Sequence, residues 1–264
     1  MKQVTFVVLI ALLCGNVVRG QTLTPSGPKK GGPSGRIVNG QSVSIQSVPF
    51  VVSIITTHAD GLSYLCGGSI ISNKNVLTAA HCLPRGLTKI ILRAGSNKSN
   101  GEGYTIPVAS WIVHPGYDPK TLDYDAAIIT INGYFSSYPN LRAIALQETE
   151  IPISSSNPTW CYTLGWGLTN GSTRTFPDNL QYTWLQLVPA TSCQFRLTPQ
   201  MVCAQYNNVS VCGGDSGGPL VCNGNLVGIT SFAGEFCPPS GHNGFTNVPS
   251  ANILNFIKRY KTDQ

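Results

Sequence analysis

Short apolar runs recur along most of this chain, and glycine, proline, asparagine and serine separate them. Runs of this length match strands, whereas a surface helix repeats apolar residues every three or four positions over a longer stretch. Many short strands with frequent breakers are typical of an all-β barrel or sandwich. The clearest runs cover residues 50–55, 76–79, 90–92, 111–113, 126–131, 184–188 and 226–232.

Only the C-terminus has the pattern of a helix. Ser250 is placed to cap it, because serine favours the position before the first helical turn. One apolar stripe repeats at helical spacing and consists of Ile253, Leu254, Ile257 and Tyr260. Three basic residues suit the negative end of such a helix, namely Lys258, Arg259 and Lys261.

The first twenty residues have the pattern of a secretory signal peptide. Lys2 precedes an apolar run over residues 4–13, and small residues end the segment at Gly20. This run is too short for a bilayer, which needs about 20 residues, and no second long apolar stretch follows. We therefore expect cleavage after Gly20 rather than a membrane anchor, and a secreted, extracellular protein. Residues 21–36 are rich in Gly, Pro, Ser and Lys, which predicts a flexible leader.

The number of cysteines indicates that the protein is exported to an oxidising compartment. Of nine cysteines, Cys14 lies in the predicted signal. The even remainder predicts a disulfide framework, for which the sequence alone allows about 105 pairings. A zinc site is the competing interpretation, but no paired CxxC or clustered histidines support it. The eight are Cys66, Cys82, Cys161, Cys193, Cys203, Cys212, Cys222 and Cys237.

The formal charge of +6 gives a misleading picture of the exported part. Five of the 17 basic residues precede Ile37, which leaves 12 basic against 11 acidic residues after that point. No basic patch remains that would indicate nucleic-acid binding.

The segment 213–219, GGDSGGP, carries the most specific chemistry. It sets the hydroxyl of Ser216 among four glycines and beside the carboxylate of Asp215. A serine is a weak nucleophile that needs a base within hydrogen-bond reach, and uncovered glycine amides can stabilise an oxyanion. His81, in TAAHC, and Asp125, in DYDAAI, precede it along the chain.

The order His, Asp, Ser with these flanks resembles the trypsin/chymotrypsin family of secreted serine proteases. Within that family the chain is most similar to arthropod chymotrypsin-like or elastase-like enzymes. The resemblance covers residues 37 to about 261. It implies two six-stranded antiparallel β-barrels with a C-terminal helix, in a protease domain over 37–264 whose barrel boundary falls roughly at 134–159. It also implies peptide or protein substrates, protein inhibitors as further partners, and a monomer.

The resemblance assigns Ser216 as nucleophile, His81 as base and then acid, and Asp125 as the group that orients His81. Asp123 is a rival for Asp125, because it lies two residues away on the same strand face. The amides of Gly214 and Ser216 are implied as the oxyanion hole. Ser231, in TSF, is implied to support the aspartate and to begin the strand to which substrate adds.

The sequence RIVNG at 36–40 resembles the family's activation site. A tryptic protease would cut after Arg36, and the new α-amino group of Ile37 would pair with Asp215. The family's disulfide pattern selects four pairs, which are Cys66–Cys82, Cys161–Cys222, Cys193–Cys203 and Cys212–Cys237.

The family alignment places Ser210 at the floor of the specificity pocket, where trypsin-like enzymes carry an aspartate. Ser210 cannot pair with Lys or Arg, so we expect cleavage after apolar residues such as Leu or Phe. The other residues implied to bind substrate here are Val211, Ser231, Phe232, Ala233 and Asn243, with Gly244 as the alternative to Asn243.

Asn97 and Asn170 begin glycosylation sequons in expected surface loops, whereas the sequon at Asn208 adjoins the pocket floor and is expected to stay unused. The loop 92–108 holds one acidic residue, Glu102, and calcium prefers several oxygen ligands. We therefore expect no metal and no cofactor.

Two other functions compete with a protease. A relative that only binds a protein partner would usually have lost one of His81, Asp125 or Ser216, and this chain keeps all three. A lipase-type hydrolase places its nucleophile first, within G-x-S-x-G on an α/β sheet, whereas here the serine comes last.

Overall fold

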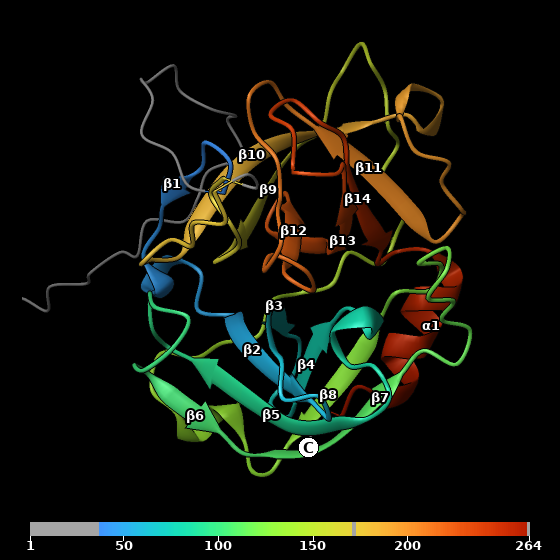
Figure 1. Cartoon of the computed structure of the whole chain (residues 1–264). Helices are drawn as coiled ribbons and strands as arrows, with labels where there is room; N and C mark the ends of the chain where they lie inside the picture. The colour runs from blue at the N-terminus through green and yellow to red at the C-terminus, as the bar shows by residue number, and fades with distance from the viewer. Residues whose placement is uncertain (1–36, 171–172, 263–264) are drawn as a thin grey trace, which may run out of the picture.

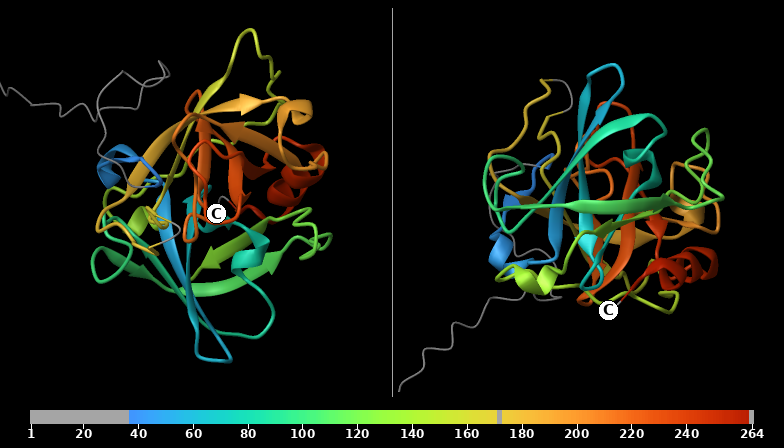
Figure 2. Two further views of the ribbon diagram at one scale, coloured as in Figure 1. Left: turned by 45° about the horizontal axis from the view of Figure 1, so that its top comes forward. Right: turned by 90° about the horizontal axis from the view of Figure 1, so that it is seen from below.

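Two antiparallel sheets follow one another along the chain, and each curls into a barrel (Figure 1). The computed structural model describes residues 37–170 and 173–262, so the predicted signal peptide and Arg36 lie outside the described residues. The last strand of the first sheet ends at Ile131, and the second barrel begins with Trp160. The two barrels lie against each other, as the turned views in Figure 2 also show.

The first sheet has the strand order β6-β5-β2-β3-β4-β8-β7. Pro107 stands between β6 and β7, and it lacks the N–H that a continuous strand would use. The strands are β2 (Val51–His58), β3 (Ser63–Ile70), β4 (Asn75–Thr78), β5 (Leu87–Ala94), β6 (Tyr104–Ile106), β7 (Val108–Val113) and β8 (Ala127–Ile131).

The second sheet has the order β1-β10-β11-β14-β13-β12-β9, and β9 also pairs with β10. This pairing closes a ring of six strands and leaves β1 attached outside it. The strands are β1 (Gln41–Ser42), β9 (Trp160–Gly165), β10 (Gln181–Val188), β11 (Met201–Gln205), β12 (Pro219–Cys222), β13 (Asn225–Ala233) and β14 (Asn243–Asn247).

The two-barrel fold expected from the sequence is confirmed, but the number of strands in each sheet differs from the six expected. Each sheet contains seven strands rather than six. In the first sheet the extra strand arises because Pro107 divides one long strand into β6 and β7. In the second it is β1, a two-residue strand that pairs with β10 at Tyr182 and Gln181.

One α-helix, α1 (Ala251–Tyr260), follows the second barrel, and its apolar face packs against the first (Figure 1). The predicted stripe is largely right, because Ile253, Leu254 and Ile257 are buried. Phe256 is buried as well and joins the first-barrel core. Each buried side chain of this size contributes roughly 1.5–3 kcal/mol, so the helix fastens one barrel to the other.

Ser250 stands at the N-cap position, but the predicted side-chain cap is wrong. Its hydroxyl makes no capping bond, and it is buried without a hydrogen-bond partner among the described residues. The main chain contributes instead, because the Ser250 carbonyl accepts the amide of Leu254 at 2.9 Å. In the described part of the chain, α1 included, no helix is long and apolar enough to cross a membrane.

Four disulfides join the same cysteine pairs that the family resemblance implies. Cys66–Cys82 connects β3 to the short 3₁₀ turn that carries His81, and Cys161–Cys222 joins β9 to β12. Cys193–Cys203 and Cys212–Cys237 close loops in the second barrel, with sequence separations of 10 and 25 residues. Two of these crosslinks therefore hold the segments that adjoin His81 and Ser216.

His114 connects the first barrel to α1. Its ring stacks on Tyr124 and contacts Phe256, each with ring centroids 4.7 Å apart, and its Nδ1 accepts the Gly116 amide at 3.0 Å. Burial lowers the pKa of His114, while a bond to the Asn252 backbone and the nearby Asp123 carboxylate act in the opposite direction. The folded protein therefore favours the neutral imidazole.

His114→Gln is expected to make stability less sensitive to acid. Because the folded pKa lies below the unfolded value of about 6.5, the stabilisation from neutral His114 is complete above that pH and is lost as pH falls through the folded pKa. Melting temperatures measured between about pH 7.5 and about pH 5 should fall more steeply in the wild type than in the variant. Parallel curves would show that His114 does not carry this dependence.

Candidate active site

His81 and Asp125 meet between the barrels. His81 lies in the 3₁₀ turn Ala80–Cys82, and Asp125 directly precedes the buried residues that lead into β8. The Asp125 Oδ2 lies 2.7 Å from His81 Nδ1, and Oδ1 accepts the His81 backbone amide at 2.9 Å. Two bonds to one residue fix both the position and the rotation of the imidazole, and leave Nε2 as the ring nitrogen that does not face Asp125.

Asp125 is fully buried, and each of its oxygens takes part in at least one hydrogen bond. Besides the two bonds to His81, the Ser231 hydroxyl donates to Oδ2 at 2.5 Å. The Thr246 hydroxyl, on β14, donates to the Asp125 backbone carbonyl at 2.7 Å. Two residues of the second barrel thus hold Asp125, Ser231 at its carboxylate and Thr246 at its backbone. The donors to the carboxylate explain why a buried charge is tolerated here.

Asp123 has a different and local role. It accepts the Thr198 hydroxyl at 2.6 Å and the backbone amide of Tyr124 at 3.1 Å. Tyr124 adopts a positive φ of 54°, so the chain turns between the two aspartates. The structure therefore brings Asp125, and not Asp123, to His81.

Ser216 is held by contacts to the segments around His81. Its carbonyl accepts the Gly67 amide at 2.7 Å, and Gly67 follows Cys66, which is disulfide-bonded to the neighbour of His81. Gly217 has a φ of 78° and packs so closely on Thr78 and Ala79 that a side chain could not fit. The half-buried Ser216 thus lies beside the strand that leads into His81.

Gly214 precedes Ser216 in the same turn and has a φ of 101°, a conformation that favours glycine. A Cβ at this position would lie 3.0 Å from Gly167 Cα and 3.3 Å from Phe176 Cε1. Gly213, Gly214 and Phe176 all line one cleft, so a side chain at Gly214 would crowd both Gly167 and the cleft. Glycine lets the backbone, rather than a side chain, face that cleft.

Asp215 is fully buried beneath the turn. Its carboxylate accepts the amides of Gly167 at 2.8 Å and Cys212 at 2.9 Å. Burial raises the pKa of Asp215 to about 7, although both amide bonds act to lower it. Between residues 37 and 262, leaving aside 171–172, no cation pairs with it. A buried carboxylate in this state is a site that a positive charge would stabilise.

The first described residues lie near this turn. Ile37 is fully buried, and Val38 forms an antiparallel bridge with Ser210. The Asn39 side chain donates to the Asn208 carbonyl at 2.6 Å. The segment 37–39 therefore packs against the residues that lead through Ser210 to Asp215.

Ser210 is fully buried and contacts Asn243 across the second barrel. The Asn243 Oδ1 lies 2.9 Å from the Ser210 hydroxyl and 2.9 Å from the Val211 amide, both of which are donors. The Asn243 Nδ2 donates to the carbonyls of Ala204 and Gly241 at 3.3 and 3.2 Å. The amide is thus saturated and held in place. Of the two residues considered for this wall, Asn243 reaches Ser210.

Gly244 instead faces the ring of Phe232, which leaves no room for a side chain there. Phe232 is half-buried and also packs edge-on against Phe195, with ring centroids 5.1 Å apart. Val211 is buried, and Ala233 is partly buried against the same core. Sequence reasoning did not identify Thr246, Phe195 or the carbonyls of Ala204 and Gly241 that accept from Asn243, because no motif marks them.

The predicted glycosylation sites lie at exposed positions. Asn97 is exposed, although its Oδ1 accepts the Ile45 amide at 2.7 Å. Asn170 is exposed too, and the next two residues of its sequon lie outside the described residues. The sulfurs of Cys66 and Cys82 lie close to His81, but they bond to each other and so offer no thiolate to a metal.

Comparison with known proteins agrees with this geometry. Residues 37–257 match the family model described as Trypsin. Trypsin alpha-4 of Lucilia cuprina is 36% identical over 75% of this chain and 77% of its own length. Trypsin delta of Drosophila melanogaster is 36% identical over 80% and 83%, and the trypsin of Sarcophaga bullata 37% over 82% and 86%. The chain therefore belongs to the trypsin family of serine proteases and is a serine endopeptidase.

Proposed function

We propose that this serine endopeptidase is secreted as a zymogen and cleaves peptide bonds after medium-sized apolar residues. Ser216 attacks the carbonyl carbon of the scissile bond, and His81 accepts its proton through Nε2. His81 then gives that proton to the leaving amine, and the acyl group stays on Ser216 as an ester. A water molecule, deprotonated by His81, hydrolyses this ester and releases Ser216. Asp125 holds the ring and stabilises its cation, while the amides of Gly214 and Ser216 donate to the oxyanion. The observation that carries this mechanism is the buried Asp125, bonded twice to His81.

The proposed specificity rests on the contact between Ser210 and Asn243. No acidic side chain is part of this contact, so a bound Lys or Arg would lose its hydration without gaining a partner there. The Asn243 amide also occupies space beside Ser210, which favours Leu-sized or Phe-sized side chains over longer ones. The relatives above are named trypsins, and trypsin-like pockets carry an aspartate where this chain has Ser210.

A panel of peptide anilides tests this proposal. The protein is cut after Arg36, the Ile37 terminus is verified, and kcat/KM is measured with Arg, Phe, Leu or Ala before the scissile bond. Leu or Phe should be preferred, and Ser216→Ala should abolish the activity. A preference for Arg would refute the neutral pocket. No hydrolysis of any substrate would favour a protein that uses the fold only to bind a partner.

Asn243→Gly is expected to shift the preference from Leu toward Phe. The substitution removes the side chain beside Ser210 and opens the pocket, and one or two methylenes of extra room discriminate by roughly tenfold. The readout is the ratio of kcat/KM for the Phe and Leu anilides. Asn140→Gly is the matched control, because Asn140 is exposed and already has a φ of 66°. An unchanged ratio in Asn243→Gly would place the pocket wall elsewhere.

The remaining proposals follow from an exported zymogen. A tryptic protease cuts after Arg36, because a pocket with Ser210 at its floor would not accept Arg36 itself. Peptides or proteins are the substrates, protein inhibitors are further partners, and the enzyme acts as a monomer. The exposed positions of Asn97 and Asn170 fit surface glycosylation in an exported protein.

A further inference from the structure

Thr78 is a fully buried residue whose hydroxyl connects the segments that carry His81 and Ser216. It is the last residue of β4, shortly before the 3₁₀ turn that holds His81. Its Oγ1 donates to the Gly67 carbonyl at 2.8 Å, and the Gly67 amide donates to the Ser216 carbonyl at 2.7 Å. Two consecutive hydrogen bonds therefore join the strand that leads to His81 with the backbone of Ser216.

The same hydroxyl packs directly against the residue that follows Ser216. A Cβ built on Gly217 would collide with Thr78 Oγ1 and with the Gly67 carbonyl oxygen, so the Gly217 backbone lies against this hydrogen bond. Within the second barrel, the Gly217 amide donates to the Thr230 carbonyl at 2.8 Å. The main chain around Ser216 is thus held both by β13 and by the pair of Thr78 and Gly67.

Thr78 also adjoins the segment that carries Asp125. It pairs with Ala127, the first residue of β8, and Asp125 lies just before that strand. One buried side chain is therefore next to all three segments from which His81, Asp125 and Ser216 project. A change in its hydroxyl can alter the position of Ser216 relative to His81 without removing an atom from either residue.

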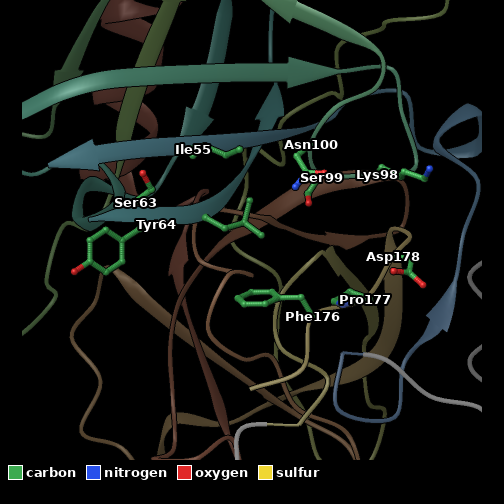
Figure 3. Close-up of a pocket in the computed structure, with 10 residues that line it drawn as sticks. Ile55, Ser63, Tyr64, Lys98, Ser99, Asn100, Phe176, Pro177 and Asp178 are labelled. Atoms are coloured by element: carbon green, nitrogen blue, oxygen red, sulfur yellow. The ribbon is translucent and has the colours of Figure 1, made fainter. Parts of the chain in front are cut away.

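The strand that contains Gly67 depends on this contact, because its pairing with β4 is short. β3 pairs with β2 along most of its length, but among the described residues its pairing with β4 covers only its last two positions. Its first residues, Ser63 and Tyr64, are exposed and line a hollow of about 750 Å³ (Figure 3). The Thr78 hydroxyl continues the connection between β3 and β4 past the point where the strand pairing ends.

We propose that Thr78 is a positioning residue that sets the place of Ser216 relative to His81. The inference rests on the proposed function, because it takes Ser216 as nucleophile and His81 as base. Without its hydroxyl the Gly67 carbonyl loses this donor, and Gly67 becomes free to shift together with the Ser216 carbonyl that it holds. The transfer of a proton from nucleophile to base depends steeply on distance, and a displacement of about 1 Å can cost about 10²-fold in rate.

Thr78→Val tests this proposal, because valine keeps the branched shape of threonine and removes the donor. With the protein cut after Arg36 and the best anilide of the panel, kcat should fall about 10- to 100-fold. KM should stay close to the wild-type value, since Ser210 and Asn243 are unchanged. Thr78→Ser keeps the donor and should restore kcat. Thr78→Ala lacks the donor as well, and provides the same test if the valine variant does not fold.

Thr163→Val is the matched control. Thr163, on β9, is also fully buried, but its hydroxyl has no hydrogen-bond partner among the described residues. Its kcat should stay close to the wild-type value. Melting temperatures are measured for both valine variants. If Thr78→Val melted at a lower temperature but kept its kcat, Thr78 would only stabilise the fold and the proposal would be overturned. An equal loss of kcat in Thr78→Ser and Thr78→Val would overturn it too, because the hydroxyl would not be the cause.

Hydrogen exchange at the Gly67 amide, followed by NMR, separates this inference from the proposed function because it does not require hydrolysis. Thr78→Val should speed this exchange about tenfold, since the bond from Gly67 to Ser216 loosens, and Thr78→Ser should not. If the wild type cleaves no peptide but the amide responds in this way, the positioning stands while the activity fails. If Thr78→Val matches the wild type in both kcat and exchange, the positioning fails while the protease remains.

Discussion

Asp125→Asn is expected to lower kcat about 10⁴-fold, the magnitude known for the equivalent substitution in the same family. The Asp125 carboxylate accepts both from His81 and from Ser231. An amide in its place can turn an N–H toward the imidazole, which then presents the wrong tautomer to Ser216. Hydrolysis of the Leu anilide by the cut protein measures the loss.

Asp123→Asn is the matched control for this prediction. Asp123 makes the same kind of bonds as Asp125, but to Thr198 and the Tyr124 amide rather than to His81. Its kcat should stay close to the wild-type value. If Asp123→Asn were inactive and Asp125→Asn active, the assignment would be reversed. Equal melting temperatures of the two variants would show that folding is not the cause.

Arg36→Gln is expected to leave an inert precursor, which is the second large effect. Asp215 is buried, its pKa is raised to about 7, and no described cation pairs with it. A raised folded pKa means that the folded chain binds a proton the unfolded chain releases, so stability falls as pH rises from about 4 through 7. A cut after Arg36 frees the α-amino group of Ile37. Its positive charge would stabilise the ionised carboxylate of Asp215 and so offset this loss of stability.

The cut enzyme should then have a pH profile of its own. Pairing with Asp215 would raise the pKa of the Ile37 amine above its usual value of about 8. Activity should then be complete below that value and be lost as the amine deprotonates at higher pH. Arg36→Lys is the control, because a tryptic protease still cuts after lysine. Full activity of uncut Arg36→Gln would refute the switch, and terminal sequencing establishes which form is present.

The sequence was sufficient where a local pattern carries the information. Apolar runs located strands such as β2, β8 and β13, and the stripe that includes Ile253 and Ile257 located α1. β14 shows the limit, because its sequence NGFTN has the composition of a turn. It is a buried strand because Phe245 packs in the core and the strand pairs with β11 and β13. Such pairing is set by distant residues that no local window contains.

In the candidate active site, too, local motifs identified residues, while the fold determined which of them meet. The motifs around His81, Asp125 and Ser216 named the residues, and the resemblance favoured Asp125 over its rival Asp123. The fold supplies the physical reason, which is the turn at Tyr124 between the two aspartates. Asn243 was one of two residues considered for the pocket wall, and its bond to Ser210 across 33 positions distinguishes them. Ser250 shows the opposite case, since a residue favoured for capping is buried where its hydroxyl finds no partner among the described residues.

The most direct test of the account is the reaction of Ser216 with a fluorophosphonate before and after cleavage at Arg36. Intact mass and peptide mapping follow the adduct over time. We expect one adduct, on Ser216, that forms rapidly in the cut chain and far more slowly in Arg36→Gln. Asp125→Asn should slow the reaction, and Asp123→Asn should not. An adduct on another residue, or none on a chain with a verified Ile37 terminus, would contradict the assignment of Ser216 as an activated nucleophile.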